Sequence, residues 1–121
     1  MISKDWWEYI HGFEGLHIYG LEESYISIKT WLLGGACYVV KDWGVGHLYR
    51  DINPAPVSGN DIDANRIFLI NLFLDGNEKE KCLKELKKRI GINAYESSEK
   101  IYKENEKTMN FMKVYIEKNK V

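Results

Sequence analysis

The chain has 121 residues, of which 45% are apolar, and a formal net charge of −1. This length and composition predict one globular domain, residues 1–121, and exclude intrinsic disorder. Phosphate contacts dominate nucleic-acid binding and require a positive excess, so the near-zero charge argues against nucleic acid as the ligand. The absence of any run of 18 or more apolar residues argues against a membrane span.

The first residues and the cysteines predict the compartment. Residues 1–6 show no charged leader followed by an apolar stretch, so we expect a cytoplasmic protein. Cys37 and Cys82 are then expected to be two small buried side chains, since disulfides persist mainly in oxidising compartments. The composition, rich in Lys, Asn and Ile, suggests a bacterial or phage gene.

The predicted elements begin with a short helix. Ser3 can cap a helix over residues 4–13, in which large apolar side chains fall on one face. Glycines interrupt the chain after it, and residues 16–19 can form a first short strand.

The most informative stretch is residues 25–49, where apolar and aromatic residues alternate with polar ones, and its first part, residues 25–43, is the predicted hairpin. Period-two alternation is typical of a strand, and the Gly34-Gly35 pair between the two halves is typical of a hairpin turn. A strand over residues 46–52 would extend the hairpin into a meander. A loop with two prolines, residues 53–60, follows it.

Residues 66–74 form a nearly continuous apolar run that fits either a buried central strand or a core helix. The length of nine residues and the Asp75-Gly76 pair that follows favour the strand. The sequence leaves the helix open as the alternative.

The C-terminal part is predicted to form two helices. Asn77 with Glu80 is typical of a capping box, and Gly91 is a typical helix end. The second helix is expected over residues 94–118. Together these elements predict an α+β fold: a short N-terminal helix, a mostly antiparallel sheet of four to five strands, and two C-terminal helices packed on one face.

Reactive side chains are densest at His47, Tyr49 and Asp51, which share one face of the predicted strand 46–52. A histidine beside a carboxylate and a phenol can act as a general acid or base, and His17 would join them if the first strand pairs nearby. A solvent-facing strand edge is the alternative explanation. The chain shows no spacing typical of a metal site, and we expect neither a metal nor a cofactor.

A second group of side chains is a candidate surface for a protein partner. Exposed aromatic rings next to acids are typical of interface hot spots, although these rings could instead fill a second small core. Residues 1–60 carry four basic and seven acidic side chains, which favours a basic partner. The candidate contacts are Tyr25, Trp31, Trp43, Glu22, Glu23 and Asp42.

With no catalytic or cofactor motif, the sequence favours a small binding protein over an enzyme. A mildly acidic aromatic face suits an inhibitor that blocks a basic, nuclease-like partner, as immunity proteins and phage inhibitors do. A small hydrolytic enzyme centred on His47 is one alternative. A homo-oligomeric structural module, such as a homodimer formed through residues 66–74 and 94–118, is the other.

Overall fold

The computed structural model describes residues 1–44, 46 and 56–121, and every regular element within these ranges is a helix. The predicted α+β class is therefore wrong, because this part of the molecule is all-α and contains no strand. The helices are α1 (Lys4–Tyr9), α2 (Glu22–Leu32), α3 (Gly59–Phe73), α4 (Gly76–Ile90), α5 (Ile92–Glu104) and α6 (Glu106–Asn119).

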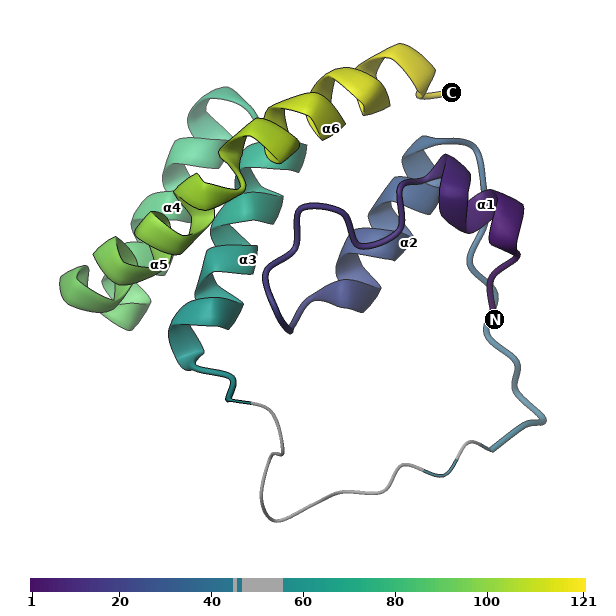
Figure 1. Cartoon of the computed structure of the whole chain (residues 1–121), viewed down its shortest axis with the longest axis horizontal. Coiled ribbons are helices and arrows are strands. Elements are labelled where there is room, and N and C mark those ends of the chain that lie inside the picture. Colours follow the sequence, from purple (N-terminus) through teal and green to yellow (C-terminus); the bar gives the residue numbers. More distant parts are fainter. Residues whose placement is uncertain (45, 47–55) are drawn as a thin grey trace.

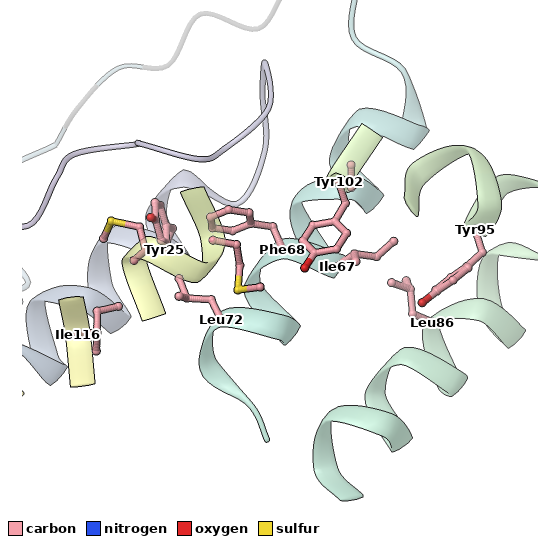
Figure 2. Close-up of a cluster of buried hydrophobic side chains, with 11 residues drawn as sticks. Tyr25, Ile67, Phe68, Leu72, Leu86, Tyr95, Tyr102 and Ile116 are labelled. Carbon is pink, nitrogen blue, oxygen red and sulfur yellow. The ribbon is translucent and has the colours of Figure 1, made fainter. Parts of the chain in front are cut away.

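Helix α3 is the centre of the packing and contacts α4, α5 and α6 (Figure 1). The loop over residues 10–21 connects α1 to α2. This loop also contacts α3, where the His17 N–H donates a hydrogen bond to Asn65 Oδ1. The core that results combines residues from α2 to α6 (Figure 2). Its buried members are Tyr25, Ala64, Ile67, Phe68, Leu72, Leu86, Tyr95, Tyr102, Met109, Met112 and Ile116.

The first half of the predicted hairpin is helix α2. Tyr25, Lys29 and Leu33 recur every four residues and are all buried, which is the spacing of one helix face. Two acids in the first turn also favour a helix N-terminus. Residues 36–40, from the second half of the predicted hairpin, are not helical, but they pair with no strand in the described part of the chain.

The apolar run 66–74 lies almost entirely in helix α3, so the favoured strand was the wrong choice. Ser58 and Asp61 form a capping box at the start of this helix: the Ser58 N–H donates to Asp61 Oδ2 at 2.7 Å, and the Asp61 N–H donates to Ser58 Oγ at 3.3 Å. The helix therefore begins well before the apolar run and reaches 15 residues, longer than a typical strand.

The helix expected over residues 94–118 is two helices, α5 and α6. Asn105 interrupts it with a φ of −104° and a ψ of 6°, which lie outside the helical range. The helix expected to follow Asn77 is confirmed as α4, with its N-cap two residues earlier at Asp75. It ends at Gly91, as predicted.

The N-terminal predictions are confirmed in part. Ser3 caps α1 by accepting a hydrogen bond from the Trp6 N–H at 3.2 Å, but the helix ends at Tyr9 rather than at residue 13. Residues 16–19 lie in an irregular loop instead of a strand. The predicted strand 46–52, apart from residue 46, falls outside the described residues.

Gly15 is a point where the N-terminal loop and α3 meet closely. Its φ is +95°, which favours glycine, and a Cβ there would overlap the ring of Phe68. We expect Gly15→Ala to lower the free energy of unfolding by about 2–4 kcal/mol, measured by urea denaturation. Gly59→Ala is the matched control, because a Cβ at Gly59 meets nothing within 4 Å. A loss in the control as large as that at Gly15 would contradict this explanation.

Candidate functional site

Two exposed tryptophans lie on α2 and on the segment that follows it. Trp31 and Trp43 each leave 77% of their surface exposed. Between them in sequence, Tyr38, Val39 and Val40 are 88%, 85% and 68% exposed. Apolar side chains this open to water often mark contact sites for other molecules.

A cavity of about 380 Å³ lies beside the Trp31 ring. Its lining is mostly apolar, a surface suited to an apolar side chain. We call this cavity and the helix turns around it the α2 groove. The residues that line it are Ser27, Ile28, Trp31, Leu32, Ala36 and Cys37.

The three predicted acids are not equivalent in the structure. Glu22 holds the turn before α2, where its Oε1 accepts a hydrogen bond from the Gly20 N–H at 2.8 Å. Glu23 and Asp42 are exposed. Glu23, one helical turn before Ser27 on α2, and Asp42 are thus exposed to solvent, and Glu22 is partly used by the fold.

Tyr25 lies in the core instead of on the predicted contact surface. It is fully buried, and its hydroxyl donates a hydrogen bond to the Glu14 carbonyl oxygen at 2.7 Å. Burial, and to a lesser degree the negative charge of Glu14, raises the pKa of Tyr25 above its ordinary value. The residue fixes α2 against the N-terminal loop and cannot contact a partner directly.

Three of the four candidate catalytic residues, His47, Tyr49 and Asp51, lie outside the described residues, so the catalytic cluster stays a prediction. His17 is described, and its Nε2 lies 3.1 Å from Asp61 Oδ1. Hydrogen bonds from the backbone and hydroxyl of Ser58, with a smaller effect of His17, hold the pKa of Asp61 below its usual value. Asp61 therefore both starts α3 and orients His17.

Asn65 is a structural residue that the sequence analysis missed. Its Oδ1 accepts a hydrogen bond from the His17 N–H at 2.7 Å. Its Nδ2 donates to the carbonyl oxygens of His17, Tyr19 and Gly20 at 2.8, 3.1 and 3.0 Å. The side chain thus fixes the loop that carries His17, and an asparagine beside an apolar run offers no sequence signal of such a role.

Lys29 is the second residue that was missed. Although it is charged in isolation, it is fully buried, and its Nζ donates to the carbonyl oxygens of Ile10 and Gly12 at 2.7 and 2.6 Å. The Nζ also lies 3.7 Å from the centroid of the Tyr25 ring. Burial lowers the pKa of Lys29 to about 7, against the opposing effect of the Glu14 charge. The four-residue spacing of Tyr25 and Lys29 fits one helix face, but it gives no sign that the lysine is buried.

The two cysteines differ in exposure. Cys37 is exposed and Cys82 half-buried, so the expectation that both are buried is wrong for Cys37 and only partly met by Cys82, although both thiols are free. Within the described ranges, no three His, Cys, Asp or Glu side chains are placed to hold a metal ion. None of the helices there is both long enough and apolar enough to cross a membrane.

Three animal enzymes of one named activity are similar to part of this chain. Polypeptide N-acetylgalactosaminyltransferase 8 of Drosophila melanogaster is 42% identical over 53 residues, which cover 43% of this chain and 9% of that protein. Polypeptide N-acetylgalactosaminyltransferase 3 of Taeniopygia guttata is 32% identical over 77 residues, 61% of this chain and 12% of that protein. Polypeptide N-acetylgalactosaminyltransferase 6 of Bos taurus is 31% identical over 78 residues, which cover 62% of this chain and 12% of that protein.

The similarity is partial on both sides. The chain spans only 9% to 12% of the length of these relatives. No family model and no solved structure matches it. Because all three relatives come from animals, nothing in this comparison supports the bacterial or phage source that the composition suggested.

Proposed function

We propose that this chain contributes polypeptide binding to the transfer of N-acetylgalactosamine. The observation that carries the proposal is the similarity, over up to 62% of the chain, to proteins whose shared name is that of this activity on polypeptides. Since the chain spans about a tenth of their length, the proposal concerns a contribution to binding and not a complete catalytic site.

The described residues support binding more than chemistry. The His17–Asp61 pair is engaged in holding α3 and its loop, and within the described ranges no three His, Cys, Asp or Glu side chains are placed to hold a metal ion. By contrast, the α2 groove has an exposed tryptophan at its rim. An apolar groove with a flat ring, on a helix that also carries the exposed acid Glu23, suits an extended peptide that carries cationic residues.

A peptide-binding measurement tests this proposal. Two fluorescent peptides would share one Ser/Thr-containing centre, flanked in one by lysines and in the other by glutamates. We expect the basic peptide to bind about tenfold more tightly at low salt, measured by fluorescence anisotropy, with the difference vanishing at high salt. Trp31→Ala should weaken both peptides, whereas Phe111→Ala, a change at an exposed ring on α6, should leave binding unchanged. Failure of both peptides to bind would contradict the proposal.

The three acids between residues 22 and 42 give a charge-specific prediction. We expect the triple variant Glu22→Gln, Glu23→Gln and Asp42→Asn to lose most of the preference for the basic peptide, about tenfold in affinity. The matched control changes three exposed acids on α4 and α5, Glu80→Gln, Glu96→Gln and Glu104→Gln, by the same total charge. Equal losses in the two variants would show that net charge, and not this surface, sets the preference.

A second candidate function, inhibition of a basic nuclease-like protein, is favoured by the exposure of both Trp31 and Trp43. Two large rings can anchor a folded partner as well as a peptide. The same variants separate the two functions. Stable binding of a basic nuclease from the source cell, lost in the acid triple variant and accompanied by no peptide binding, would favour the inhibitor.

A further inference from the structure

Residues 36–40 form an exposed, non-helical segment that follows α2 (Figure 1). Tyr38, Val39 and Val40 are residue types that favour strands, and all three are largely open to water. Within the described ranges, no backbone hydrogen bond involves residues 36–40. Backbone N–H and C=O groups that make no backbone hydrogen bond within the described ranges, and that lie beside apolar side chains, form a surface to which another strand can add.

We propose that two copies of this chain pair through residues 36–40 as antiparallel strands related by a twofold axis. This inference does not require the proposed function, although the segment shares Ala36 and Cys37 with the α2 groove. In a closed pair the same segment serves both copies, so each supplies the backbone partners that the other lacks. Trp31, on α2, lies outside this paired segment.

The side chains of the segment are compatible with such a self-pairing. With Val39 opposite Val39 of the second copy, Tyr38 of each chain faces Val40 of the other. Pairs of an aromatic and a β-branched residue are favourable across strands. The same register places Asp42 opposite Ala36 of the second copy, so the two acids do not face each other.

The exposed apolar side chains set an upper limit on the area that the dimer can bury. The rings of Tyr38 and Trp43, together with Val39 and Val40, expose on the order of 500 Å² in each copy. Two copies thus offer at most about 1,000 Å², which is the lower limit for a specific protein interface, and strand pairing buries only part of this area. The expected complex is a weak dimer.

Sedimentation equilibrium of the whole chain between about 1 and 200 µM tests the proposal. We expect a concentration-dependent rise from the monomer mass of 14.2 kDa to twice that value. The N–H groups of Val39 and Val40 point to opposite edges of a strand, so only one of them faces the second copy. One of the two variants Val39→Pro and Val40→Pro should therefore weaken the dimer at least tenfold, because it removes the N–H that the ladder uses.

Val39→Thr and Val40→Thr are the matched controls, because threonine keeps the backbone N–H and the preference for strands. Both should dimerise to within about threefold of the unmodified chain. Circular dichroism checks that all four variants fold, as expected for two exposed positions. A monomer at every concentration, a mass that grows beyond two copies, or proline variants that dimerise as well as their threonine counterparts would each overturn the proposal.

Discussion

A rise in pH from 7 to 9.5 is expected to increase the free energy of unfolding by about 2–3 kcal/mol, because of Lys29. In the folded chain, burial lowers the pKa of this amine to about 7, whereas in the unfolded chain the pKa returns to its ordinary value of 10.5. Between these two values unfolding takes up a proton, so raising the pH opposes unfolding. Below pH 7 the amine is charged in both states and contributes no slope.

Urea denaturation at a series of pH values measures this effect. Lys29→Met keeps the length of the side chain but cannot titrate, so its stability should stay nearly constant between pH 7 and 9.5. Lys84→Met, a change at an exposed lysine on α4, should retain the rise. A flat profile for the unmodified chain would show that Lys29 titrates near its ordinary pKa in the folded state.

Above about pH 10 the trend should reverse, because buried tyrosines then dominate. Burial is the main cause that raises the pKa of Tyr102 to about 12, and it raises the pKa of Tyr25 further. The unfolded chain therefore loses these phenolic protons at a lower pH than the folded chain does. The maximum in the free energy of unfolding is therefore expected at about pH 9.5 to 10.

Asn65→Asp is expected to lower the free energy of unfolding by about 3–5 kcal/mol. The substitution keeps the shape of the side chain and the acceptor for the His17 N–H. It replaces the amide that donates to three carbonyl oxygens by a second acceptor, so those oxygens face a buried carboxylate. Urea denaturation gives the size of the loss, and hydrogen exchange of the His17 and Gly20 amides shows whether the loop opens.

Asn93→Asp is the control for this substitution, since Asn93 is exposed in the first turn of α5, where a negative charge is favourable. Its stability should change by less than about 0.5 kcal/mol. A loss below about 1 kcal/mol at Asn65 would mean that the loop is held by other contacts.

Helices with explicit start and stop signals were predictable from the sequence. The Ser3 cap predicted the start of α1, and Gly91 predicted the end of α4. Both signals act within a few residues, so they do not depend on the rest of the fold. Helix α3 had an equally local signal in Ser58 and Asp61, but the loop prediction over residues 53–60 concealed it.

Helix α2 could not be identified by polarity alone. Its buried face contains Lys29, which a binary pattern counts as polar, so the four-residue repeat from Tyr25 to Leu33 was broken at its centre. The amine can be buried only because two carbonyl oxygens from the preceding loop meet it. That contact belongs to the tertiary structure and leaves no trace in the local pattern.

The candidate site shows the same division between local and tertiary information. The sequence indicated that Trp31 and Trp43 were worth attention, but it could not tell which rings are exposed. The position of Tyr25 in the core and the engagement of Glu22 with Gly20 both follow from the start of α2. Both positions could be deduced only once residues 22–32 were known to form a helix.

The positions of the four tryptophans determine which structural changes the intrinsic fluorescence of this protein reports. Trp6 and Trp7 are half-buried against neighbours in the N-terminal region, and the Trp6 indole N–H donates to Thr30 Oγ1 at 3.3 Å. Trp31 and Trp43 already face water in the native chain. Intrinsic fluorescence will therefore report loss of structure mainly around α1. A dissolved ionic quencher will act chiefly on the exposed indoles of Trp31 and Trp43. Protection from such a quencher offers an optical readout of anything that covers them.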